Sequence, residues 1–317
     1  MALTLSTKAV VLQAPETLSV RELALSAPGS DDLVVDVDWS GISAGTERLL
    51  WSGRMPDFPG MGYPLVPGYE SVGRVVDAGS DVADRIGETV FVPGARCFGD
   101  VRGLFGGSAA RVVVASQRAP AIHEHLGREG VLLALAATAY HALAASDAVL
   151  PDLIVGHGVL GRLLARIATS LADEAPTVWE TNAKRAEGAQ GYAVAHPDKD
   201  DRRDFRAIYD VSGDSTLLDS LIGRLSRGGQ IVLAGFYDKP LQFAFPPAFM
   251  REARLRVAAE WQPGDLEAVL GLIDAGKLSL DGLITHNEPA DAADRAYRTA
   301  FGDPDCLKMV LDWRNAA

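Results

Sequence analysis

Cysteine is scarce in this sequence, whose 317 residues include only Cys97 and Cys306. Two cysteines cannot supply a disulfide framework, nor a structural zinc lobe with four cysteine ligands. We therefore expect both thiols to stay reduced, which is typical of a cytoplasmic protein.

Basic charge and long hydrophobic runs are also scarce. There are 30 Lys and Arg against 42 Asp and Glu, and the resulting net charge of −12 opposes binding to nucleic-acid phosphates. The longest apolar run, around Val131–Ala139, is too short to span a bilayer, and no signal peptide is visible. These features predict a cytoplasmic protein with no transmembrane segment and no nucleic-acid partner.

The chain is long enough for two domains, and 48% hydrophobic residues argue against disorder. Its first part has the pattern of short strands separated by Gly- and Pro-rich turns. These strands are expected at Lys8–Leu12, Asp32–Val37, Ser71–Asp77, Thr89–Val92 and Ala110–Val114. Farther along, strand and helix patterns alternate, which predicts an α/β fold with a Rossmann-type doubly wound parallel sheet. We place this dinucleotide-binding domain at residues 125–276, and the β-rich domain at 1–124 and 277–317.

A glycine-rich turn in the middle of the chain carries the clearest functional signal. The stretch 153–161, Leu-Ile-Val-Gly-His-Gly-Val-Leu-Gly, places a buried strand before a Gly-x-Gly-x-x-Gly turn, and a helix follows. The first glycine allows the tight turn, the second lets the backbone approach a pyrophosphate, and the third lets helix and strand pack closely. The N–H groups that begin the helix would bind the phosphates, although a purely structural strand–turn–helix is the alternative. The predicted phosphate-binding residues are Gly156, His157, Gly158, Val159, Leu160 and Gly161.

An acidic residue at the end of the next strand completes this fingerprint. The strand is expected at Pro176–Glu180, and Glu180 lies about 20 residues past the last glycine. Its carboxylate would accept hydrogen bonds from the adenosine ribose and repel a 2′-phosphate, which favours NAD over NADP. Lys184 and Arg185 follow closely and weaken this preference. The remaining cofactor residues predicted on this part of the chain are Ser212 and Gly235.

Three segments, Gly41–Glu47, Val66–Val75 and Thr138–Leu143, make the whole chain resemble a medium-chain dehydrogenase/reductase. They are similar to that superfamily's Gly-x-Cys-Gly-Thr-Asp segment, its Pro-Gly-His-Glu-x-x-Gly-x-Val signature and the helix that opens its cofactor domain. The resemblance implies that the β-rich part is a GroES-like catalytic domain, rejoined by the C-terminal segment. It also implies that Thr46 is a relay hydroxyl and that Thr138 lines the nicotinamide site.

The chain departs from the zinc-dependent members of this superfamily, which hold a catalytic metal through a cysteine, a histidine and a second cysteine. Ser43 or Ala44 stands at the first position, Tyr69 at the second and Ala134 near the third. Only Glu70 could still bind a metal, whereas a catalytic zinc needs about three protein ligands. We therefore predict no metal site.

Three further runs, Phe58–Pro64, Val92–Gly99 and Phe245–Glu252, are long and unusual. They resemble a narrower family, the dehydrogenases that oxidise the 3-(1-hydroxyethyl) group of a bacteriochlorophyllide to a 3-acetyl group in bacteriochlorophyll biosynthesis. The resemblance implies a tetrapyrrole substrate, a bacteriochlorophyllide or chlorophyllide, and NAD as hydride acceptor. It implies a cytoplasmic protein, at most peripheral to photosynthetic membranes, and a homodimer by analogy alone.

Alcohol oxidation requires a group that takes the hydroxyl proton, and the catalytic candidates are Thr46, Tyr69 and Glu70. Tyr69 either points into the active site or packs as an ordinary aromatic residue, and as a base it needs a pKa well below its usual ~10. Thr46 either relays the proton or bonds its own turn. Glu70 either orients Tyr69 or pairs with an arginine. Two other functions stay open: a zinc-free quinone or enone reductase, and a non-catalytic dinucleotide-binding protein.

Overall fold

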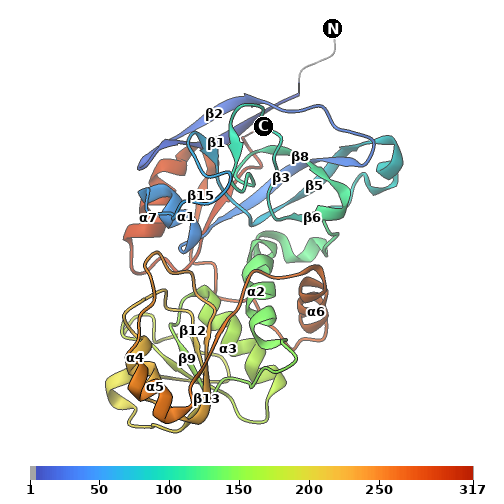
Figure 1. The fold of residues 1–317 in the computed structure, drawn as a ribbon. Coiled ribbons are helices and arrows are strands. Elements are labelled where there is room, and N and C mark those ends of the chain that lie inside the picture. The colour runs from blue at the N-terminus through green and yellow to red at the C-terminus, as the bar shows by residue number, and fades with distance from the viewer. Residues whose placement is uncertain (1–4, 317) are drawn as a thin grey trace. The chain divides into compact units, whose positions relative to one another are not determined.

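The computed structural model describes residues 5–316, which divide into two compact units (Figure 1). The first unit contains the residues up to Ala134 together with those from Leu283 onward, and the second contains Leu135–Gly282. Both boundaries lie later in the chain than the predicted ones, after residues 124 and 276.

Local packing explains both boundaries. The segment before the first boundary stays with the β-rich unit because Gly130 packs directly on Val72, whose Cγ2 would lie 2.7 Å from a Cβ added at the glycine. The segment before the second boundary stays with the other unit because Arg166 binds its backbone. The Arg166 guanidinium donates to the carbonyl oxygens of Ser279 and Asp281, at 2.7 and 3.0 Å.

Two sheets build the first unit. Its strands are β1 (Ser6–Ala14), β2 (Thr17–Ala24), β3 (Asp32–Ile42), β4 (Leu65–Val66), β5 (Ser71–Ala78), β6 (Thr89–Val92), β7 (Arg102–Gly103), β8 (Arg111–Ala115), β15 (His286–Pro289) and β16 (Met309–Asp312). One sheet has the order β2-β1-β4-β7, and the other has the order β15-β16-β3-β5-β6, with β8 also paired to β3. The helical segments are α1 (Thr46–Ser52), α7 (Ala293–Gly302), η1 (Ser80–Arg85), η2 (Ser116–Arg118), η3 (Glu124–Leu132) and η5 (Ala290–Ala292).

The core of the first unit joins residues from both ends of the chain. Apolar side chains of β1, β3 and β8 form one buried cluster with Tyr297 and Trp313 from the C-terminal segment. The Trp313 indole N–H donates to Ser40 Oγ at 2.8 Å, and β16 pairs antiparallel with β3. The C-terminal segment is therefore an integral part of this unit.

The second unit is an α/β fold with one parallel sheet. Its strands are β9 (Leu153–Val155), β10 (Thr177–Trp179), β11 (Ala193–Ala195), β12 (Phe205–Asp210), β13 (Leu225–Leu233) and β14 (Arg254–Val257). Its helical segments are α3 (Val159–Leu171), η4 (Pro197–Lys199), α4 (Leu218–Ile222), α5 (Phe245–Arg251) and α6 (Pro263–Asp274), and α2 (Leu133–Leu143) leads into it. The strand order is β11-β10-β9-β12-β13-β14, with every pair parallel, which confirms the predicted Rossmann-type sheet.

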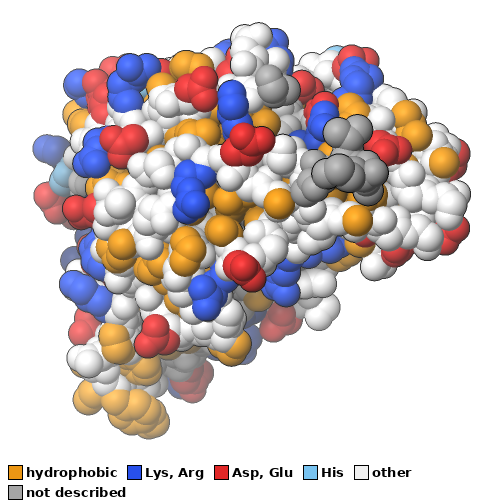
Figure 2. All heavy atoms as spheres, turned by 90° about the horizontal axis from the view of Figure 1, so that it is seen from above, with side chains coloured by type: hydrophobic (Ala, Val, Ile, Leu, Met, Phe, Trp, Pro, Cys, Tyr) orange, Lys and Arg blue, Asp and Glu red, His pale blue; other side chains and the backbone are white. Residues whose placement is uncertain are grey.

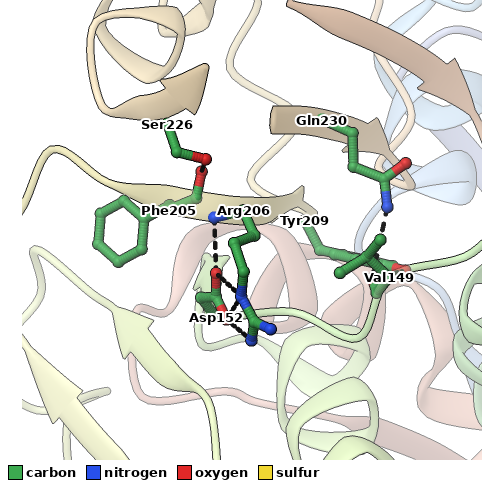
Figure 3. A network of polar contacts seen from close by, with 7 residues as sticks. All are labelled: Val149, Asp152, Phe205, Arg206, Tyr209, Ser226 and Gln230. Atoms are coloured by element: carbon green, nitrogen blue, oxygen red, sulfur yellow. Dashed lines mark hydrogen bonds and ion pairs between the residues drawn. The ribbon is translucent and has the colours of Figure 1, made fainter. Parts of the chain in front are cut away.

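A polar network fastens the amino ends of the central strands (Figure 3). The Asp152 carboxylate, just before β9, accepts from the backbone N–H of Arg206 at 2.6 Å and from its guanidinium at 2.5 Å. The carbonyl of Val149 accepts from the Tyr209 hydroxyl and the Gln230 amide. These contacts are structural, because ligands of such sheets bind at the opposite, carboxyl edge.

The surface carries both signs of charge. Figure 2 shows acidic and basic side chains interspersed over the face that it draws. None of the helices within residues 5–316 is long and apolar enough to cross a membrane.

Candidate active site

Three hydroxyl groups meet at Tyr69 in the first unit. Ser43 follows β3, Thr46 begins α1, and Tyr69 lies between β4 and β5. The Tyr69 hydroxyl lies 2.6 Å from Ser43 Oγ, and the Thr46 side chain is close enough to lower the pKa of Tyr69. Phe105 packs edge-on against the Tyr69 ring, with the ring centroids 5.3 Å apart, which fixes the ring's orientation. The structure thus brings two of the predicted catalytic residues, Thr46 and Tyr69, into one cluster.

Burial and the nearby carboxyl groups of Glu70 and Glu47 raise the pKa of Tyr69 above its ordinary value. A phenol that acts as a base at neutral pH needs the opposite shift. Tyr69 therefore stays protonated near neutral pH. It can pass its own proton to a neighbouring hydroxyl while it accepts another, which favours a relay over a general base.

Glu70 is fully buried, and its carboxylate forms an ion pair with the buried Lys308, directly before β16. Burial raises the pKa of Glu70, and the Lys308 ammonium opposes that effect. Gly41 permits this packing, since a Cβ there would lie 2.3 Å from Glu70 Oε2. The expected arginine partner was wrong, because the C-terminal segment supplies a lysine. Glu70 influences Tyr69 through its charge.

A second buried carboxyl group, Glu47, lies directly after Thr46 and was not predicted. The Tyr297 hydroxyl donates to its Oε2 at 2.5 Å, and the Ser43 backbone N–H donates to its Oε1 at 3.1 Å. Burial raises the pKa of Glu47 to about 7, with the charge of Glu70 adding to the shift. Glu47 therefore ties the Ser43 backbone to helix α7. The sequence signal for it was its position next to a relay hydroxyl.

In the glycine turn of the second unit, two glycines pack closely against the protein and one faces open space. Gly156 has φ +104°, and a Cβ there would lie 3.2 Å from Ser212 Cα. A Cβ on Gly161 would lie 1.9 Å from the Gly156 carbonyl oxygen. At Gly158, which precedes α3, an added Cβ meets nothing within 4 Å. A phosphate can approach the backbone at that position without a clash.

The other predicted cofactor residues lie at the same edge of the sheet. Glu180, Ser212 and Gly235 follow β10, β12 and β13, near their carboxyl ends, as the glycine turn follows β9. Glu180 Oε2 accepts from the His157 backbone N–H at 3.2 Å, and Oε1 accepts from that of Asn182 at 2.8 Å. The carboxylate is thus held next to the glycine turn.

The backbone N–H of His157 contacts Glu180 at this edge, whereas its side chain does not. Its ring is buried and bonds the Arg185 carbonyl oxygen at 2.5 Å and the Tyr192 hydroxyl at 2.8 Å. Burial lowers the pKa of His157 to about 4, so the imidazole is neutral near pH 7. Val159 and Leu160 form the first turn of α3, where backbone N–H groups lack helical partners.

One predicted residue, Thr138, lies on α2, and a histidine lies one turn farther along the helix. Thr138 is partly exposed there and stays a predicted nicotinamide contact. His141 Nδ1 lies 2.8 Å from Asp265 Oδ2 of α6, so the histidine ties two helices together.

The sequence matches the model of the alcohol dehydrogenase GroES-like domain at residues 29–124. It is also 58% identical over 313 residues to a 2-desacetyl-2-hydroxyethyl bacteriochlorophyllide A dehydrogenase from Rhodobacter capsulatus, covering 98% of this chain and 100% of that one. The chain belongs to this family of dehydrogenases. A member from Cereibacter sphaeroides is 57% identical, with 98% and 99% of the two chains covered.

Solved structures support the same architecture. An oxidoreductase of unknown specificity from Escherichia coli has a TM-score of 0.84 at 20% identity, with 97% and 99% of the two chains covered. An E. coli alcohol dehydrogenase complexed with NADH has a TM-score of 0.81 at 21% identity and the same coverage. At these identities the likeness concerns the fold. The predicted superfamily, its GroES-like domain and the narrower dehydrogenase family are confirmed.

In this dehydrogenase, the positions that correspond to the zinc ligands of the zinc-dependent members are occupied by other residues. Ser43 and Tyr69 offer neutral hydroxyl groups and are bonded to each other, while Ala134 offers no donor. Glu70 is engaged by Lys308. Within residues 5–316, no three His, Cys, Asp or Glu side chains gather in a group that could hold a metal ion.

Proposed function

We propose that the chain oxidises the 3-(1-hydroxyethyl) group of a bacteriochlorophyllide to a 3-acetyl group, with NAD as the oxidant and without a catalytic zinc. The observation that carries the proposal is the 58% identity, over almost the whole chain, to a dehydrogenase named for that hydroxyethyl substrate. The hydroxyl cluster at Tyr69 and the open glycine turn supply the two parts that such a reaction needs.

The hydroxyl cluster handles the proton of the alcohol. Bound NAD supplies the acceptor for the hydride that leaves the carbinol carbon. The substrate hydroxyl donates its proton to Tyr69 Oη as the C=O bond forms. Tyr69 passes its own proton to its hydrogen-bond partner Ser43 or to the nearby Thr46. The hydroxyl that accepts this proton releases its own to solvent, which the partly exposed Thr46 can reach. Glu47 holds the Ser43 backbone in place for this transfer.

The glycine turn and Glu180 fit a dinucleotide. The space at Gly158 admits the pyrophosphate, and the N–H groups at the start of α3 bind its oxygens. The Glu180 carboxylate is fixed beside the turn, where it accepts hydrogen bonds from the adenosine ribose. Its negative charge repels a 2′-phosphate, so we propose NAD as the preferred cofactor.

The test is an anaerobic absorption assay with 3-(1-hydroxyethyl) bacteriochlorophyllide a and either NAD or NADP. Conversion of hydroxyethyl to acetyl extends the conjugated system, so the long-wavelength band should move to the red with NAD, and more slowly with NADP. No shift despite detectable NAD binding would favour a reductase of another substrate or a non-catalytic binding protein. Equal catalytic efficiency with both cofactors would refute the role given to Glu180.

We predict that a strong chelator leaves this activity unchanged. Neutral hydroxyls and an ion-paired carboxylate are poor zinc ligands, which usually are thiolate, imidazole or a free carboxylate. The measurement is the turnover rate before and after chelation, with elemental analysis of the purified protein. A stoichiometric zinc whose removal abolishes turnover would refute the zinc-free mechanism.

We also propose that the chain forms a homodimer through β14 and α5. Strand β14 is an edge of the parallel sheet, and its Val257 is 75% exposed. Phe245, Phe249 and Met250 of α5 are between 65% and 73% exposed. Such side chains expose on the order of several hundred Å², a large part of the ~800 Å² per partner in a standard interface. An edge strand pairs with its own copy about a two-fold axis.

Light scattering should therefore give the mass of a dimer for the natural chain and of a monomer for Val257→Lys. Ile86→Lys is the control, since Ile86 is an exposed apolar residue of the other unit. A monomeric natural chain, or a Val257→Lys variant that stays dimeric, would refute this interface. If the natural chain instead bound liposomes and Val257→Lys did not, the exposed apolar residues of β14 and α5 would be assigned to a membrane surface.

A further inference from the structure

Arg162 of α3 is a buried cation whose partners are all backbone carbonyl oxygens. Its side chain contacts the glycine turn and is 6% exposed. Its Nε donates to the His157 carbonyl at 3.1 Å, and Nη1 to that of Gly188 at 3.2 Å. Its Nη2 donates to the carbonyls of Arg185 and Glu187, at 2.9 and 2.8 Å. One guanidinium thus joins the glycine turn to the segment that follows Glu180 along the chain.

The His157 ring makes the same connection by a second route. A carbonyl oxygen only accepts hydrogen bonds, so the Nδ1 that faces the Arg185 carbonyl must carry the proton. The neutral ring then has an unprotonated Nε2, which accepts from the Tyr192 hydroxyl. Burial keeps this ring neutral across the working pH range, so the connection does not depend on pH.

The backbone of the connected segment is shaped for Arg162. Gly188 has φ +78°, a conformation that L side chains rarely adopt, and a Cβ there would lie 2.6 Å from Arg162 Nη1. Asn182, at the start of the segment, donates its backbone N–H to Glu180. The segment 182–188 is therefore bound by Glu180 at its beginning and by Arg162 at its end.

We propose that Arg162, assisted by His157, is a positioning residue that pre-forms the adenosine part of the cofactor site. This positioning role rests on the proposed dinucleotide function. It implies that a buried arginine, which binds only the protein backbone, sets the affinity for the ADP-ribose half of NAD. Without this connection, the segment 182–188 must be ordered when the cofactor binds, which weakens binding.

Arg166 provides a matched control. It lies one turn farther along α3 and is equally buried, at 6% exposure. Its guanidinium binds the carbonyls of Ser279 and Asp281, in a segment remote in sequence from the glycine turn. Its charge also acts on Tyr192, the hydroxyl partner of the His157 ring.

The experiment measures the dissociation constants of ADP-ribose and NAD by calorimetry for the natural chain, Arg162→Met, Arg162→Lys and Arg166→Met. We expect Arg162→Met to weaken ADP-ribose binding by about tenfold or more, with kcat at saturating NAD unchanged. Arg162→Lys keeps the charge but cannot bridge four carbonyls, so it should also bind more weakly. Arg166→Met should lower the melting temperature without changing the ADP-ribose affinity.

Each outcome is decisive. Natural affinity in a folded Arg162→Lys variant would overturn the bridging role, and this variant keeps the test valid if Arg162→Met fails to fold. Equal losses of affinity in Arg162→Met and Arg166→Met would reduce the effect to general destabilisation and overturn the proposal. If the natural chain bound neither NAD nor ADP-ribose, the proposed function itself would fall, and this inference with it.

Discussion

Replacing Lys308 with methionine is expected to lower the free energy of unfolding by about 3–5 kcal/mol, among the largest effects of any single substitution in this chain. The variant leaves the fully buried Glu70 carboxylate without its cationic partner. Glu70 Oε1 already lacks a hydrogen-bond donor, so the remaining protein offers little compensation. Chemical denaturation at neutral pH measures the loss.

The pH dependence of this loss identifies its cause. In the Lys308→Met variant the pKa of Glu70 should rise further, because burial acts without an opposing ammonium group. A carboxyl group with a raised pKa in the folded state contributes stability at low pH and loses it as the pH rises through that pKa. The difference between variant and natural chain should therefore be small in mildly acidic solution and large near neutral pH.

Two controls separate charge from packing. Lys8→Met removes an exposed lysine of β1 and should leave the stability nearly unchanged. The double variant Glu70→Leu, Lys308→Met removes both buried charges and should recover much of the loss. A single variant as stable as the natural chain, at all pH values, would show that Glu70 is not held as a buried carboxylate.

The features that could be predicted from the sequence are local in the chain. The glycine turn, the strand before it and the helix after it occupy one short stretch, so their spacing alone indicated the phosphate-binding edge. Glu180 could be found in the same way, because consecutive strands of a doubly wound sheet end at one edge. The fold of the second unit follows from the same alternation of strands and helices.

The features that could not be predicted join distant parts of the chain. Lys308 meets Glu70 across 238 residues, and Tyr297 meets Glu47 across 250. No periodicity encodes such contacts, since the return of the C-terminal segment to the first unit creates them. A weak signal existed: Lys308 is a single charge within an otherwise apolar run, where an unpaired lysine is rarely tolerated.

Tyr69→Phe is expected to lower kcat at least roughly 100-fold while changing KM little, since proton transfer by a positioned side chain contributes about 10²–10⁴ to the rate. The phenyl ring should still pack edge-on against Phe105, so the fold should remain intact. Only the hydroxyl that contacts Ser43 and Thr46 is lost. Steady-state kinetics with the hydroxyethyl substrate, together with a melting curve, measure both effects.

Tyr63→Phe is the matched control, because Tyr63 is a partly buried tyrosine of the same unit whose hydroxyl donates to the Leu50 carbonyl. It should lose some stability and keep its kcat. The raised pKa of Tyr69 also means that the natural enzyme should show no loss of activity from its ionisation near neutral pH. Full turnover in Tyr69→Phe would remove the phenol from the proton path. The relay would then have to run through Ser43 or Thr46 directly, which Ser43→Ala and Thr46→Ala would decide.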